Sequence, residues 1–118
     1  MRTDLVESLA GSNVRGVVTV GALEEMIAGL SWSAFTDALE SGDPRTVRSV
    51  LRAAMRAAGD LRPVDVENEA TRLIEEAGLN PCHAFALRLV QDALSKVETA
   101  RKNSRAVPAD AAPAADGT

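Results

Sequence analysis

The chain has 118 residues, of which 46% are hydrophobic and only 3% aromatic, and its formal net charge is −4 with a pI near 5.0. This length suits one domain with a modest core, and the acidic balance argues against a protein whose main task is to bind phosphate backbones. Cys82 is the only cysteine, which excludes an internal disulfide and predicts a reducing, cytoplasmic location. The N-terminal residues lack the apolar run of a secretory signal, and no segment is apolar for long enough to span a membrane.

Residues 1–20 predict a lead-in to the helical part of the chain. Residues 1–13 predict a short helical turn built around three apolar side chains, Leu5, Val6 and Leu9. Residues 14–20, VRGVVTV, form the only β-branched run, and Gly16 within it indicates a bulge or an edge. Because one strand cannot stand alone, three arrangements stay open: pairing with the N-terminal segment, pairing with another subunit of a homo-oligomer, or an extended lead-in.

The next segment, from Ala22 to Gly42, predicts two short helices. The first carries an apolar stripe at helical spacing, formed by Ala22, Leu23, Met26, Ile27 and Leu30. Ser31 is a suitable N-cap for the second helix, and Gly42 closes it. In the second helix Trp32 and Phe35 stand three residues apart and are expected to anchor it to the core. An exposed Trp32 would instead be an anchor for a protein interface.

The segment from Asp43 to Gly59 predicts a third helix, over Pro44–Ala58, in which both ends and both faces can be assigned. Asp43 can cap its N-terminus, Pro44 suits the first helical position, and Gly59 suits the left-handed conformation that ends it. One face gathers the apolar side chains Val47, Val50, Leu51, Ala54 and Ala58. The opposite face, within an arc of about 80°, holds what we call the arginine face: Arg45, Arg48, Arg52 and Arg56.

Three interpretations of the arginine face stay open: a solvated surface, a surface that binds a protein partner, or a surface that binds nucleic acid. A helix-turn-helix arrangement would make the following helix, from about Asp65 to Ala77, the one that enters the DNA groove. That helix holds five acidic residues and only one basic residue, Arg72, which is the wrong charge for a major groove. Binding of nucleic acid is therefore the least favoured of the three interpretations.

Two further helices and a tail complete the predicted architecture. The helix that ends at Ala77 buries Val66, Ala70, Leu73, Ile74 and Ala77. The last helix, from Pro81 to about Lys102, buries Ala86, Leu87, Val90, Leu94 and Val97. Residues 104–118 have almost nothing to bury and predict a disordered tail. The expected fold is a mainly α bundle of about four to five helices within residues 1–103, with at most a short N-terminal β element.

The sequence offers no pattern of residues that suits catalysis, a metal or a cofactor. Cys82 and His83 are adjacent, so on a helix they point about 100° apart and cannot chelate one ion together. The carboxylate pairs Glu24–Glu25 and Glu75–Glu76 are adjacent instead of facing, and the scattered glycines match no phosphate-binding loop. The sequence therefore predicts a protein that is not an enzyme and holds neither a cofactor nor a metal.

Three segments in a fixed order carry a resemblance to a known family: VTVGALEEMIAGLSWSAFTDALESGDPRTVRSVLRAAMRAAG, VENEATRLIEEAGL and NPCHAFALRLVQDAL. This order resembles the small tail assembly chaperones of tailed bacteriophages and of phage-derived gene transfer agents. In that family a strand leads into a glutamate-bearing helix, then a short aromatic helix, a helix rich in Leu, Arg and Ala, an acidic helix and a last helix. Members typically begin with a fuller β-hairpin, whereas only residues 14–20 indicate a strand here.

The resemblance implies a non-enzymatic virion-morphogenesis factor of a phage, prophage or gene transfer agent. Such a protein binds the long helical tape-measure protein, keeps it soluble and helps to recruit the tail-tube protein. The candidate contacts, chosen by pattern alone, are Arg45, Arg48, Arg52, Arg56 and Trp32. The main alternative is a small DNA-associated regulatory protein that uses the arginine face, and a third is a helical interaction module of an unrelated complex.

Overall fold

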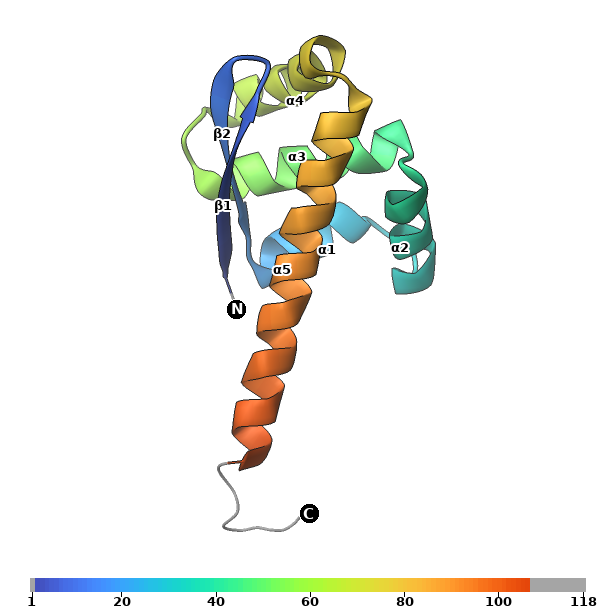
Figure 1. The fold of residues 1–118 in the computed structure, drawn as a ribbon, viewed down its shortest axis with the longest axis vertical. Coiled ribbons are helices and arrows are strands. Elements are labelled where there is room, and N and C mark those ends of the chain that lie inside the picture. The colour runs from blue at the N-terminus through green and yellow to red at the C-terminus, as the bar shows by residue number, and fades with distance from the viewer. Residues whose placement is uncertain (1, 107–118) are drawn as a thin grey trace.

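The computed structural model describes residues 2–106, with side chains for residues 2–97, and shows a β-hairpin followed by five helices (Figure 1). The elements are β1 (Thr3–Leu9), β2 (Ser12–Val18), α1 (Val20–Ile27), α2 (Trp32–Ser41), α3 (Pro44–Ala58), α4 (Pro63–Ala77) and α5 (Leu79–Ala106). Helix α3 is central, since it packs against β2 and against each of the other helices. Helix α5 passes from α4 across the hairpin and then projects from the body (Figure 1). The predicted mainly α fold with a small N-terminal β element is confirmed.

The predicted N-terminal helical turn is wrong, because residues 3–9 form β1 and pair antiparallel with β2. Ala10 and Gly11 connect the strands with φ values of 52° and 78°, which is typical of the type I′ turn of a tight hairpin. Along β1 the exposed residues alternate with buried or half-buried ones, so the true period is two. Val6 is exposed on the face opposite Leu9, and the helical spacing of the apolar residues was therefore misleading. Of the three arrangements left open for the predicted strand, the structure therefore contains pairing with the N-terminal segment of the same chain.

Gly16 lets α3 and α5 lie close to β2. The strand covers Ser12–Val18, two residues earlier than predicted, and its register with β1 is continuous. Of the predicted bulge or edge, the structure contains the edge, since over residues 2–106 the sheet has only two strands. A Cβ atom at Gly16 would lie 3.0 Å from Cδ1 of Leu89 and 3.3 Å from Cβ of Ala54. Close packing between the sheet and two helices, and not an unusual φ, is therefore the reason for glycine at this position.

The cap residues of α1 and α2 fix where these helices begin and end. The side chain of Thr19 accepts a hydrogen bond from the Ala22 amide, so α1 begins at Val20 and the predicted strand ends before it. Helix α1 ends at Ile27 because Ala28 adopts a left-handed conformation, with a φ of 49°. The predicted apolar stripe extended to Leu30, which is wrong: Leu30 lies beyond the helix and is 49% exposed. Ser31 caps α2 as predicted.

Helix α3 matches its prediction at both ends and on its apolar face. Asp43 Oδ1 accepts a hydrogen bond of 2.9 Å from the Arg45 amide, Pro44 is the first helical residue, and Gly59 ends the helix with a φ of 76°. Of the predicted apolar face, four side chains are buried and one is half-buried: Val47, Val50, Leu51 and Ala54, then Ala58. The core of the domain therefore forms around this face.

Helices α4 and α5 each begin two residues before their predicted starts. Pro63 is the first residue of α4, and Pro81 falls inside the first turn of α5, which begins at Leu79. The residues predicted to face the core are buried at Val66, Ala70, Leu73, Ala86 and Val90 and half-buried at Ile74, Ala77, Leu87, Leu94 and Val97. Helix α5 continues through Ala106, so residues 104–106 of the predicted tail are helical, and residues 107–118 lie outside the described residues.

Candidate partner-binding surface

The arginine face divides into two halves, and its C-terminal half is engaged within the protein. Nη1 of Arg52 lies 3.0 Å from Oε2 of Glu67 in α4, and Nη1 of Arg56 lies 3.0 Å from Oε2 of Glu25 in α1. Each such pair near the surface stabilises the fold by about 0–1 kcal/mol. Their larger consequence is that two of the four predicted contact arginines join α3 to its neighbouring helices and are not free cations.

The N-terminal half of the arginine face is exposed. The side chain of Arg45 is 88% exposed, and its Nη2 lies 3.6 Å from Oδ2 of Asp43, at the same end of α3. Arg48 is also exposed, and within residues 2–97 it has no ion-pair partner. Arg45 and Arg48 are therefore the two members of the arginine face that no other helix engages.

An apolar groove of about 400 Å³ opens beside Arg45, between α1, α2 and the start of α3, and we call it the α1–α2–α3 groove. Its lining comes from the end of α1 and the turn that follows, from two alanines of α2, and from the first turns of α3: Met26, Ile27, Ala28, Leu30, Ala34, Ala38, Asp43, Arg45, Thr46 and Ser49. Ala34 and Ala38 stand four residues apart, so they share one side of α2 and present little bulk there. The groove can therefore accept apolar side chains that project from a partner.

Leu30 is the large apolar side chain that the fold leaves exposed in this groove. It is 49% exposed, because Ala28 and Gly29 both have positive φ values and turn the chain away from the axis of α1 before Leu30 is reached. Sequence reasoning placed Leu30 in the core and so missed it as a candidate contact. The Ala28–Gly29 pair, which ends the helix early, was the signal that could have identified it.

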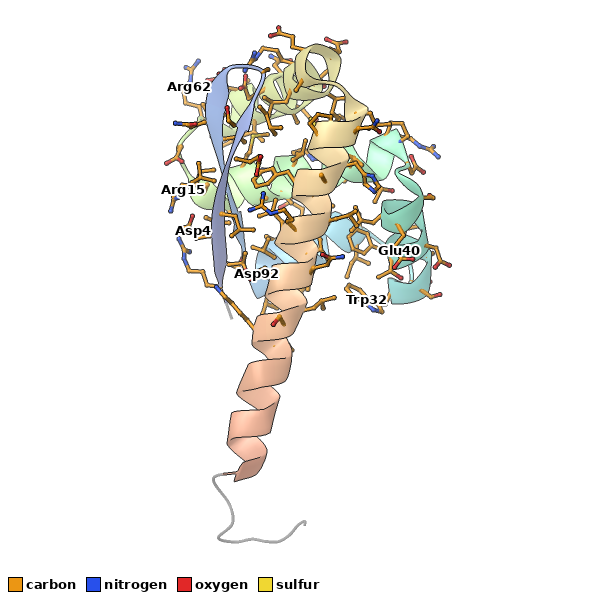
Figure 2. The ribbon with its side chains drawn as sticks, in the orientation of Figure 1. Asp4, Arg15, Trp32, Glu40, Arg62 and Asp92 are labelled. Carbon is orange, nitrogen blue, oxygen red and sulfur yellow. The ribbon has the colours of Figure 1, made fainter. Side chains whose placement is uncertain are left out.

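Trp32 and Phe35 have different roles, although the sequence predicted that both anchor α2. Phe35 is fully buried and does anchor the helix, whereas Trp32 is 42% exposed. The two ring centroids are 5.7 Å apart with an angle of 36° between the planes, so Trp32 covers Phe35 with part of its ring. Figure 2 shows Trp32 at the N-terminal end of α2, at the outer edge of the molecule. It lies two residues from Leu30 and meets the description of an interface anchor.

A second, smaller depression of about 250 Å³ lies on the other side of Arg45, between α3 and α4. It is lined by Pro44, Arg45, Arg48, Thr71, Ile74 and Glu75. Arg45 lines both depressions and so stands between them, whereas Arg48 lines only the smaller one. Glu75 places a negative charge in the smaller depression, and the α1–α2–α3 groove is the larger of the two and has more apolar residues in its lining.

The adjacent pair Cys82 and His83 has structural contacts. Cys82 is fully buried, and burial raises the pKa of its thiol, which disfavours the reactive thiolate. Nε2 of His83 lies 2.6 Å from the carbonyl oxygen of Leu39, so the ring joins the start of α5 to the end of α2. Within residues 2–97, no group of three or more His, Cys, Asp and Glu side chains is placed to hold a metal ion.

Arg15 is the centre of a charged cluster that fixes the hairpin to the end of α3. Its Nη2 lies 2.9 Å from Oδ2 of Asp4, and its Nη1 lies 3.2 Å from Oδ1 of Asp60 and donates a hydrogen bond to the carbonyl oxygen of Ala58. Asp4 and Arg15 are neighbours on the outward side of the hairpin (Figure 2). The hydrogen bonds and charge of Arg15 hold the pKa of Asp4 below its usual value of 3.8.

The site defined by this geometry is a largely apolar groove with the Asp43–Arg45 ion pair on one wall, which is a surface suited to a protein partner. Comparison of the chain with protein-family models, with curated proteins and with solved structures finds no match. Among the described residues, none of the helices is long and apolar enough to cross a membrane.

Proposed function

We propose that this chain is a non-enzymatic tail assembly chaperone of a tailed phage, prophage or gene transfer agent. It binds the tape-measure protein and assists assembly of the tail-tube protein. The observation that carries the proposal is the α1–α2–α3 groove, where exposed Leu30, with Trp32 close to it in sequence, accompanies exposed Arg45. Exposed apolar side chains beside a groove are typical of protein-binding sites.

The shape and polarity of the α1–α2–α3 groove suit an amphipathic helix. Such a helix binds by placing its apolar stripe in a groove, with anchor residues three or four positions apart. The resemblance names a long helical protein as the partner, and its apolar stripes need to be covered before the tail is assembled. A small protein whose groove covers part of such a stripe keeps the long helical partner soluble without any chemical step.

The N-terminal hairpin also supports the proposal. The resemblance expects a β-hairpin ahead of the first helix, where the sequence indicated only residues 14–20 as a strand. Strands β1 and β2 supply that hairpin, directly before α1. The order of elements along the chain is therefore the one that the resemblance expects.

The alternative of a DNA-associated regulator has no comparable support, and we do not propose it. Arg52 and Arg56 are paired with Glu67 and Glu25, so only two of the four arginines of this face, Arg45 and Arg48, are not held by a carboxylate of another helix. Affinity for DNA depends on the number of phosphates that the protein's cations neutralise. The acidic net charge of −4 further weakens binding to DNA.

Co-expression with the long helix-rich protein encoded next to this chain's gene tests the proposal. We expect the chain to keep that protein soluble and to co-purify with it. Arg45→Glu should weaken the co-purification, while Arg62→Glu should not. Arg62 is a matched control because it is also exposed, also lies at the start of a helix and also pairs with a nearby aspartate.

Two results would overturn the proposal. One is a helix-rich neighbour that is equally insoluble with and without the chain. The other is binding of the chain to duplex DNA that weakens steeply as salt is raised, which would favour the regulator instead.

A further inference from the structure

Strand β1 has an outer edge without a strand neighbour. Over residues 2–106 the sheet contains only β1 and β2. The two-residue turn makes Leu9 and Ser12 a hydrogen-bonded pair, and the alternation of the ladder then turns the backbone N–H and C=O groups of Asp4, Val6 and Ser8 outward. These three residues are all exposed.

Helix α5 lies on the inner face of the hairpin, and within residues 2–97 its one hydrogen bond to the backbone here, from Nζ of Lys96 to the carbonyl oxygen of Arg2, is made ahead of the strand. Oγ1 of Thr3 donates a hydrogen bond of 3.0 Å to Oδ2 of Asp92, and Arg88 forms an ion pair with Glu7. Thr3 and Glu7 are the alternate residues of the strand, so their side chains lie on the inner face of the hairpin. The outward backbone groups of β1 therefore remain available to another strand.

Strand β1 has few of the features that usually protect an exposed edge. Proteins prevent edge-to-edge pairing with prolines, bulges or charged side chains. Strand β1 contains no proline, its register has no bulge, and its middle residue, Val6, is apolar and 55% exposed. Both charged side chains of the strand are already paired within the chain: Asp4, on the outward face, with Arg15 at 2.9 Å, and Glu7, on the inner face, with Arg88.

We propose that β1 pairs antiparallel with β1 of a second copy of this chain, across a two-fold axis at Val6. Val6 is the middle residue of Thr3–Leu9, so this register uses the whole length of the strand. It places Val6 opposite Val6 and Asp4 opposite Ser8, which joins the two hairpins into one continuous sheet.

The side chains favour this register. It covers the exposed Val6 with the same residue of the second copy, and on the inner face it sets Glu7 opposite Leu5, so no like charges meet. A register centred on Asp4 would set two carboxylates opposite each other and would leave Ser8 unpaired. This inference rests on the hairpin alone and does not depend on the proposed function.

Sedimentation velocity of the full chain over a range of concentrations tests the pairing. We expect the wild type to form a dimer, and Val6→Lys and Val6→Pro to be monomers. Proline is informative because the amide of Val6 points outward, so its loss removes a bond to the second copy and leaves the ladder with β2 complete. Val64→Lys is the matched control, since Val64 is 68% exposed and lies on α4, and it should dimerise like the wild type.

Circular dichroism shows whether each variant is folded, and cysteine cross-linking tests the register. In a hydrogen-bonded antiparallel pair the Cα atoms are about 5.5 Å apart, which suits a disulfide. Oxidation of Val6→Cys should therefore give a covalent dimer, while Ser8→Cys, which lies opposite Asp4, should not. The native Cys82 is fully buried and does not compete.

Each of the following results would contradict either the dimer or its register. A wild type that stays monomeric up to its solubility limit, or a dimer that survives in folded Val6→Lys, overturns the proposal. A Ser8→Cys cross-link without a Val6→Cys cross-link overturns the register. Binding of a strand from another protein at this edge, with the chain itself monomeric, would also contradict pairing with a second copy.

Discussion

Gly16→Ala should destabilise the protein, although the φ of Gly16 is not positive and its backbone conformation suits any residue. The new Cβ atom would lie 3.0 and 3.1 Å from the two methyl carbons of Leu89 and 3.3 Å from Cβ of Ala54. Overpacking of this kind typically lowers the free energy of unfolding by about 1–3 kcal/mol, while removing a glycine from a strand raises it by about 0.5–1 kcal/mol. The expected net loss is therefore about 1 kcal/mol, at the midpoints of those two ranges.

Urea unfolding followed by far-UV circular dichroism measures this change. Gly21→Ala is the matched control: a Cβ atom there meets only Oγ1 of Thr19, at 3.9 Å, so the substitution should be neutral or stabilising. In a Leu89→Ala background the main clash is absent, and Gly16→Ala should lose most of its effect. If Gly16→Ala stabilises the protein as Gly21→Ala does, or if its effect is unchanged beside Leu89→Ala, then the packing explanation of Gly16 is wrong.

Three further predictions concern stability and accessibility. Phe35→Ala should lower the free energy of unfolding by about 3–5 kcal/mol and Trp32→Ala by only about 1 kcal/mol, because Phe35 is fully buried and Trp32 is not. Urea unfolding measures both losses, and equal losses would contradict the different roles of the two side chains. Arg15 lowers the pKa of Asp4 in the folded state, so the ionised carboxylate stabilises the fold. The wild type should therefore be more stable than Asp4→Asn above pH 3.8, and this difference should disappear as the pH falls through the lowered pKa. Unfolding of both proteins at several pH values measures this difference, and a constant difference would refute it. Cys82 should react with a thiol reagent much more slowly in the native than in the unfolded protein, and fast native labelling would show that it is accessible.

The parts of the fold that local residue chemistry determines could be predicted from the sequence. The ends of α3 follow from Asp43, Pro44 and Gly59, which act within one turn of the chain. Its apolar face follows from helical periodicity alone, because the amphipathic helix packs against a core wherever that core lies. These features need no knowledge of the rest of the molecule.

Strand β1 could not be predicted in the same way. Leu5, Val6 and Leu9 have a spacing that suits a helix, and the strand period becomes visible only once Val6 is known to face outward. Pairing with β2 decides the conformation, and that contact is tertiary. Gly16 was correctly singled out, but its cause, the side chains of Leu89 and Ala54, comes from distant parts of the chain.

The candidate site shows the same division. The pattern of α3 placed four arginines on one face, but it gave no sign that Glu67 and Glu25 from other helices would pair with Arg52 and Arg56. The α1–α2–α3 groove was not predictable, because it forms between three helices and depends on the early end of α1 at Ile27. Charge on one helix can be read from sequence, whereas the availability of that charge depends on packing.

We propose that the α1–α2–α3 groove binds a helical segment of a tape-measure protein. Calorimetric titration of such a segment into the wild type, Leu30→Asp and Val64→Asp tests it most directly, since Leu30 lines the groove and Val64 is equally apolar but lies on α4. Leu30→Asp should weaken the affinity by about tenfold or more, equivalent to about 1.4 kcal/mol, and Val64→Asp should bind like the wild type. Wild-type affinity in folded Leu30→Asp would contradict the claim.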